Sequence, residues 1–127
     1  MRKYKRLLPL VITGALLGGM AISLGASAPE LELTVTARGM AFYLDEDPQP
    51  NPALALESDR LIRLTFVNED RGVLHDLTLG GLDLATDLLP GDGSRQTLTF
   101  RTPKRPLSSS YNCSQHLAMM TAALEIR

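Results

Sequence analysis

Apolar and polar residues alternate along several short segments of the chain. Residues 31–37 alternate throughout, and residues 61–67 place Ile62, Leu64 and Phe66 on one face. In the segment that follows, residues 75, 77 and 79 likewise share a face and are a histidine and two leucines. A period of two is typical of strands that bury one face, so these segments predict β-strands.

Further strands are predicted at residues 40–44, 96–101, 107–113 and 120–127. Turns separate the strands, most clearly at residues 45–52, which contain three prolines, and at the glycine-rich residues 80–81 and 90–93. Residues 82–89 could form a short helix. The short strands and the near absence of a helical period predict an all-β fold, an antiparallel Greek-key β-sandwich of about seven to eight strands.

The N-terminus predicts export from the cytoplasm. Four basic residues at positions 2, 3, 5 and 6 precede an uncharged run over residues 7–28, which is 22 residues long. Basic start, apolar middle and small residues at the end are typical of a signal peptide, but the run is also long enough to span a membrane, and Pro29 should hinder cleavage after Ala28. Residues 1–28 are therefore predicted to be a signal peptide or a hydrophobic helix that anchors the protein to the membrane. Both alternatives give a periplasmic or other extracytoplasmic location.

The remainder, residues 29–127, has the length of one small domain with one core. All 14 acidic residues but only nine of the 13 basic ones lie in it, so its net charge is −5. This charge argues against a nucleic-acid partner and allows attraction to a basic partner surface. We expect a monomer.

Candidate metal ligands gather near the C-terminus. The chain has one cysteine and two histidines: Cys113 and His116 stand within eight residues of Met120, and His75 opens a predicted strand. A thiolate and two imidazoles suit copper, and a weakly bound thioether tunes its redox potential, although a cysteine and two histidines could also hold zinc. A single cysteine cannot form an internal disulfide in an oxidising compartment, and metal ligation explains its presence.

Residues 111–120 (YNCSQHLAMM) resemble the C-terminal ligand loop of the cupredoxins, the family of plastocyanin, azurin, amicyanin and pseudoazurin. Residues 64–70 followed by 75–79 are similar to the family's strand, loop and first histidine, and residues 98–100 to its next strand. The resemblance runs from about residue 31 to residue 127. It implies a protein that is not an enzyme and that passes electrons between redox partner proteins with one copper ion cycling between Cu(I) and Cu(II).

The resemblance implies four copper ligands: His75, Cys113, His116 and Met120. Met120 shares a strand face with the apolar Leu124 and Ile126, which favours it as the axial ligand. The shorter spacing of amicyanin-like proteins would select Met119 instead. Apolar residues flank both histidines, and by the resemblance His116 would be the point at which electrons leave; these residues are Val73, Leu74, Leu117 and Ala118.

The sequence departs from the family at Asp76, because asparagine commonly follows the first ligand histidine. If the carboxylate of Asp76 accepts hydrogen bonds from the segment at Ser114, its negative charge near the thiolate should lower the reduction potential. Alternatively, Asp76 faces solvent. A second departure, Ala122 in place of a common glycine, should alter packing only.

Two other functions use the same residues. A copper module for delivery, storage or sensing would bind the ion with the same soft ligands but release it to a partner. A copper oxidase or reductase would need further ligands, and no histidines are left to supply them. A hydrolase built on Cys113 would need an oriented base and an oxyanion site, for which the sequence has no motif.

Overall fold

The computed structural model describes residues 28–127. Within that range the chain forms nine strands and no α-helix, and no helix there is long and apolar enough to cross a membrane. The predicted signal peptide or membrane anchor falls almost wholly on residues 1–27, outside the described residues. In chain order the strands are β1 (Leu31–Arg38), β2 (Ala41–Leu44), β3 (Leu54–Leu56), β4 (Leu61–Asn68), β5 (Thr78–Leu79), β6 (Leu84–Ala85), β7 (Ser94–Arg101), β8 (Leu107–Asn112) and β9 (Thr121–Ile126).

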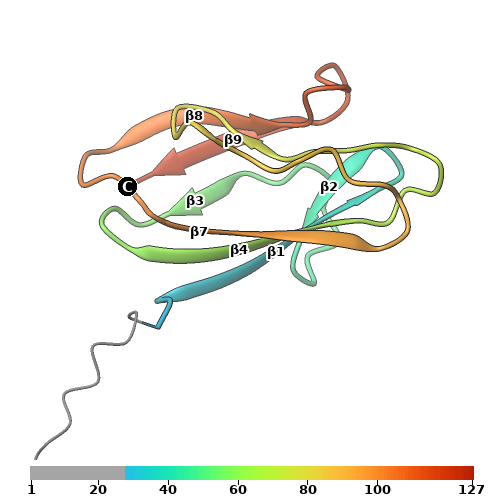
Figure 1. The fold of residues 1–127 in the computed structure, drawn as a ribbon. Coiled ribbons are helices and arrows are strands. Elements are labelled where there is room, and N and C mark those ends of the chain that lie inside the picture. The colour runs from blue at the N-terminus through green and yellow to red at the C-terminus, as the bar shows by residue number, and fades with distance from the viewer. Residues whose placement is uncertain (1–27) are drawn as a thin grey trace, which may run out of the picture.

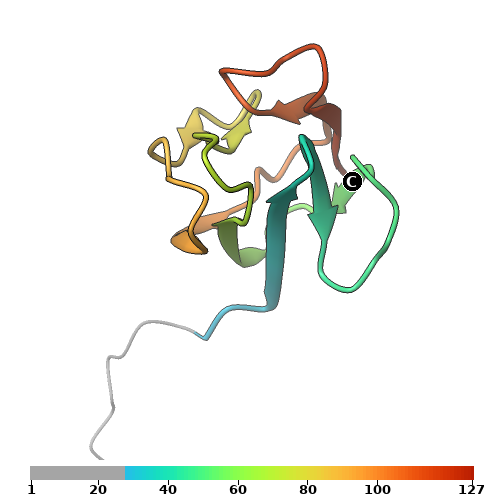
Figure 2. The ribbon, with the colours of Figure 1, turned by 90° about the vertical axis from the view of Figure 1, so that its right-hand side faces the viewer.

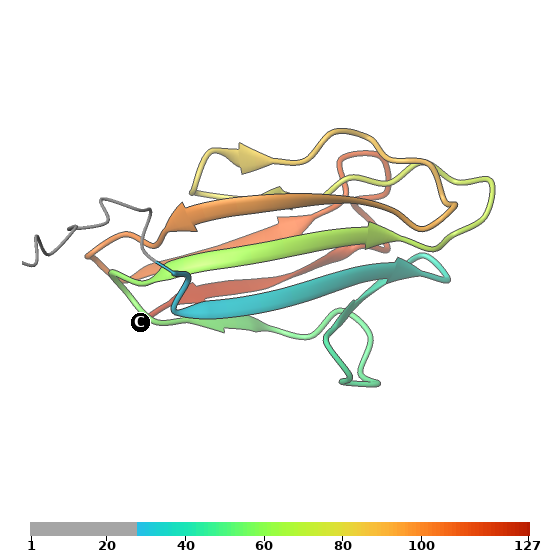
Figure 3. The ribbon, with the colours of Figure 1, turned by 60° about the horizontal axis from the view of Figure 1, so that its bottom comes forward.

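The strands form two sheets that lie face to face. One sheet has the order β2-β1-β4-β7 and the other β3-β9-β8-β5-β6, and Figures 1 and 3 show them as two layers of a sandwich. Alternating side chains of each sheet point into the space between the layers, as the sequence pattern requires. The predicted all-β sandwich is confirmed.

The sheets are mixed, whereas the sequence predicted antiparallel pairing throughout. Strand β1 pairs with β4 in parallel, with Val35 opposite Phe66, and β3 pairs with β9 in parallel, with Leu54 opposite Leu124. A parallel pair needs a long connection, because the chain must return to the end of the sheet from which it started. Residues 39–60 make that return between β1 and β4, and they include β2 and β3.

Two short segments also differ from the prediction. The helix considered at residues 82–89 is absent, because β6 turns back on β5 and pairs Leu84 with Leu79. The two glycines at positions 80 and 81 allow this tight reversal, and the amide of Thr86 donates to the carbonyl of Leu77, 2.9 Å away. Strand β3 was not predicted, since three residues are too few to show an alternating pattern.

The core fills the space between the sheets and reaches the end of the sandwich at the loop between β8 and β9. Phe42 packs edge-on against Phe66 and at a tilt against Tyr111, with ring centroids 6.2 and 5.3 Å apart. Cys113 and Met120 belong to the same buried cluster. The predicted ligand loop therefore begins and ends in the core rather than on the surface.

Tyr111 of β8 binds the loop between β2 and β3 through its hydroxyl group. The hydroxyl donates to the carbonyl oxygen of Pro52, 2.6 Å away, and the side chain is buried. Burial raises the pKa of Tyr111 from its ordinary value of 10.0 to about 12. The folded protein therefore holds the phenol proton more tightly than the unfolded chain does, and the stabilisation is present below pH 10 and lost as the pH rises through 12.

We expect Tyr111→Phe to lower the free energy of unfolding by about 1–2 kcal/mol at pH 7, because it leaves the Pro52 carbonyl without its donor. Between pH 10 and 12 the free energy of unfolding of the wild-type protein should fall because Tyr111 ionises. The variant should fall less over this range, because it has no phenol at this position. Denaturant titrations across this pH range measure both effects. Tyr43→Phe, at the half-buried edge strand β2, is the matched control. An unchanged alkaline decrease in Tyr111→Phe would contradict the assignment.

Candidate metal centre

Two loops at one end of the sandwich bring the predicted ligands together. His75 lies just before β5 and pairs with Leu89, with backbone hydrogen bonds of 2.8 and 3.2 Å. Cys113 follows β8 directly, and His116 lies in the loop that leads to β9. Figure 2 looks onto this end of the molecule, with the red loop between β8 and β9 at the top.

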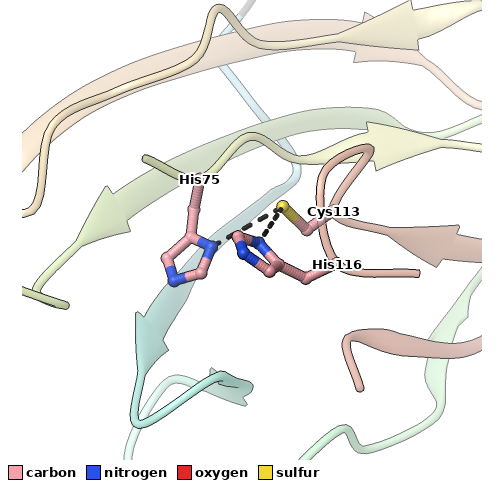
Figure 4. Close-up of side chains that lie close together, drawn as sticks. All are labelled: His75, Cys113 and His116. Atoms are coloured by element: carbon pink, nitrogen blue, oxygen red, sulfur yellow. Dashed lines mark hydrogen bonds between the residues drawn. The ribbon is translucent and has the colours of Figure 1, made fainter. Parts of the chain in front are cut away.

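The side chains of His75, Cys113 and His116 point toward one another (Figure 4). The sulfur of Cys113 lies 3.6 Å from Nδ1 of His75 and 3.6 Å from Nδ1 of His116. The candidate ligand atoms of all three residues lie within 4.8 Å of one another. Sulfur and nitrogen ligands at roughly 2.3 and 2.0 Å from one ion, about 120° apart, would be separated by about 3.7 Å. The observed spacing therefore fits a shared metal ion.

The three residues differ in exposure. His75 and Cys113 are completely buried, whereas His116 is half-buried. Backbone hydrogen bonds fold the ligand loop on itself: the amide of Cys113 donates to the carbonyl of Met120 at 3.0 Å, and the amide of Met120 donates to the carbonyl of His116 at 2.8 Å. The loop thus holds His116 at the surface while Cys113 stays in the core.

The two methionines of the loop lie in opposite environments. Met120 is fully buried and Met119 is 54% exposed. The predicted strand register is correct, since Leu124 and Ile126 are buried with Met120 while Thr121 is exposed. Met120 belongs to the same buried core cluster as Cys113, and its role as axial ligand stays a prediction.

Asp76 connects the two loops. Its side chain is buried, and its Oδ1 accepts a hydrogen bond from the amide of Ser114 at 2.7 Å. The hydroxyl of Ser114 donates to Oδ2 of the same carboxylate. The alternative in which Asp76 faces solvent is wrong. A carboxylate therefore binds the residue that directly follows Cys113.

Asn68 supports His75, and the sequence interpretation missed it. This buried residue donates from Nδ2 to the carbonyls of Val73 and Leu89, at 2.8 and 2.7 Å. The first precedes His75 by two residues, and the second pairs with it. The alternation of residues 62, 64 and 66 continues to position 68, so the pattern placed a polar side chain in the core and could have identified it.

Asp70 is a second residue that the sequence interpretation missed. Its Oδ2 lies 2.8 Å from Nε2 of His75, the ring nitrogen on the side away from Cys113. The sequence does not indicate this contact, because the fold determines which side chain lies opposite Asp70.

The residues that precede or follow the two histidines in the sequence expose apolar side chains at the surface. Leu74, next to His75, is 52% exposed, and Leu117, next to His116, is 58% exposed. Ala118 is exposed as well, and Val73 is half-buried. Large exposed apolar side chains in one region are typical of a surface that contacts a partner.

Solved structures of copper proteins have the same fold. Auracyanin B is 27% identical to the chain, with a TM-score of 0.61 and with 81% of this chain and 93% of that one covered. Reduced rusticyanin is 16% identical, with a TM-score of 0.64 and coverage of 80% and 82%. Rusticyanin from Thiobacillus ferrooxidans is 17% identical, with a TM-score of 0.63 and coverage of 79% and 79%. No family model matches the chain, and no curated protein matches it.

Both of these proteins are cupredoxins, and rusticyanin is a copper protein. The chain has their fold over most of its length. The cluster of His75, Cys113 and His116 fits a blue-copper site with one copper ion as cofactor.

We expect Asp76→Asn to raise the reduction potential of the copper-loaded protein. The amide keeps the shape of the side chain but removes a negative charge beside the residue that follows Cys113, and that charge favours Cu(II) over Cu(I). A tenfold change in the relative binding of the two oxidation states corresponds to about 59 mV, which is the size of effect expected here. Voltammetry measures the shift, with the exposed Asp87→Asn as a control for net charge. An unchanged or lower potential in Asp76→Asn would count against this role.

Proposed function

We propose that this cupredoxin is a mononuclear blue-copper electron-transfer protein that works outside the cytoplasm and passes electrons between redox partner proteins. One observation carries the proposal. The single cysteine and both histidines of the whole chain converge, with the sulfur of Cys113 3.6 Å from the nearer nitrogen of each ring. Residues without a shared role would rarely all meet at one point.

In this proposal His75, Cys113 and His116 bind the copper ion, and Met120 provides the weak axial sulfur. Copper, when bound, supplies a one-electron change between Cu(I) and Cu(II). The chain contributes soft sulfur and imidazole donors in a buried setting, which suits copper in both states. His75 comes from a position 38 residues before Cys113, so the two loops must stay fixed relative to each other.

Rigidity of the loops that hold His75 and Cys113 supports fast electron transfer. Asn68 holds both backbone segments around His75, and Asp76 ties that region to Ser114. Ligands that keep their positions in both oxidation states need little rearrangement when an electron arrives or leaves. Residues locked by packing and by supporting hydrogen bonds provide such a fixed geometry.

His116 is the proposed point of electron exchange. It is the least buried of the three clustered residues, and Leu117 next to it is 58% exposed. Exposed apolar side chains such as Leu117 support brief contacts with partner proteins, because burying them requires no desolvation of a charged group. A partner that docks there would reach the edge of a ligand ring directly.

The location outside the cytoplasm rests on the N-terminus. Residues 1–28 combine a basic start with an uncharged apolar run, which supports a signal peptide or a membrane anchor. Residues 29–127 are then the copper-binding domain. The acidic excess of that domain supports protein partners rather than nucleic acid.

The proposal is tested by adding Cu(II) to residues 29–127, which contain the whole described core, and recording visible and electron-paramagnetic spectra. We expect an intense blue colour and a reversible one-electron couple, and we expect Cys113→Ser to abolish the colour. A colourless protein that binds only Cu(I) and releases it to a partner would instead indicate copper delivery. Tight zinc binding without a blue copper form would indicate a zinc site.

The two methionines provide a second test. We expect Met120→Leu to raise the reduction potential and alter the spectra, because a thioether donor stabilises Cu(II) and leucine has none. Met119→Leu, one residue earlier and on the exposed side, is the matched control and should leave both unchanged. The opposite result would assign the axial position to Met119.

A further inference from the structure

The ring of His75 is held from both sides. Its Nδ1 faces the sulfur of Cys113 at 3.6 Å, and its Nε2 lies 2.8 Å from Oδ2 of Asp70 (Figure 4 shows the ring). The side chain of His75 is completely buried, and that of Asp70 is 14% exposed. The contact between Asp70 and Nε2 is therefore largely shielded from water, which strengthens it.

The carboxylate of Asp70 has further donors from another part of the chain. The amides of Gly39 and Met40, in the turn between β1 and β2, donate to Oδ1 and Oδ2 respectively. Both residues have positive φ angles, 57° and 61°, so consecutive amides point toward the same carboxylate. Such a concave arrangement of amides binds an anion. With Nε2 of His75, three donors surround the carboxylate.

These donors keep Asp70 ionised. Backbone amides can only donate hydrogen bonds, and those of Gly39 and Met40 point at the two carboxylate oxygens, so each oxygen acts as an acceptor, as in the ionised form. An ionised carboxylate can only accept hydrogen bonds. His75 must then carry its proton on Nε2, which leaves the lone pair of Nδ1 directed toward Cys113.

We propose that Asp70 is a positioning residue of the metal centre, which fixes the tautomer and the ring orientation of His75 and makes its Nδ1 a stronger donor to Cu(II). The inference rests on the proposed function, because it concerns how that copper site is tuned. A carboxylate hydrogen-bonded to the outer nitrogen of a ligand histidine increases the basicity of the inner nitrogen. A stronger donor favours Cu(II), so Asp70 lowers the reduction potential.

A purely structural role is the competing explanation. Asp70 also holds the turn at residues 39–40, and loss of that contact would destabilise the protein whatever happens at His75. Asp70→Asn separates the two roles. Its single oxygen can still accept from the Met40 amide and from Nε2 of His75, whereas its uncharged NH2 group cannot accept from the Gly39 amide, so stability and reduction potential are measured separately. Asp87→Asn, which removes the same charge from an exposed position, is the matched control.

The first measurement needs neither copper nor a variant. Long-range proton–nitrogen correlation spectra of the metal-free full chain at pH 8 report which nitrogen of His75 carries the proton. We expect the proton on Nε2. A proton on Nδ1 would overturn the proposal, whether or not the protein proves to be a blue-copper carrier.

The second measurement compares reduction potentials of the copper-loaded full chain. We expect Asp70→Asn to weaken the preference for Cu(II) over Cu(I) about tenfold, which raises the potential by about 59 mV. Asp87→Asn should change it far less. An Asp70→Asn protein with lowered thermal stability but an unchanged potential would show that the residue only holds the turn, and would overturn the proposal. A wild-type protein with no blue copper form would instead refute the proposed function, while the tautomer measurement would still test Asp70.

Discussion

The hydrogen bonds between Asp76 and Ser114 fix the distance between two loops on which the metal centre depends. His75 directly precedes Asp76, and Cys113 directly precedes Ser114, so the carboxylate joins the two ligand segments one residue from each ligand. Without this contact, only the short pairing of β5 with β8 and the packing of the core would hold the two ligand segments together, with the sulfur 3.6 Å from the ring nitrogen. A charged acceptor with two donors is a stronger restraint than a contact between neutral groups.

The pairing of β5 with β8 brings Asp76 and Ser114 close together. Strand β5 pairs with β8 so that Thr78 faces Asn112, which brings the chain before β5 alongside the chain after β8. The two strands are antiparallel, and their facing ends place residues 75–76 and 113–114 at the same edge of the sandwich. The pairing lasts only two residues, so it sets the register but leaves the ligand loops free to adopt the irregular backbone that the centre requires.

The sequence predicted what local patterns determine. Alternation predicted the β-sandwich and the buried face of β9, and the small number of cysteines and histidines predicted that His75, Cys113 and His116 would meet. It did not predict the parallel pairing of β1 with β4, because two strands so far apart in sequence can pair in either direction. The contact of Asp70 with His75 was not predicted either. Amides of residues 39–40 bind the Asp70 carboxylate, and the sequence does not show that this turn lies next to the loop after β4.

The two histidines differ in burial and in the groups that their rings contact. His75 is buried, and both of its ring nitrogens face groups of the protein, so its position and its electronic properties are set by the interior. His116 reaches the surface beside Leu117, where a partner can approach its ring. Carboxylates act near His75 and Cys113, on the buried side, while the surface around His116 carries apolar side chains. In this arrangement carboxylates inside the protein tune the metal, while apolar side chains at the surface beside His116 are available to a partner and need lose no charge-bound water on contact.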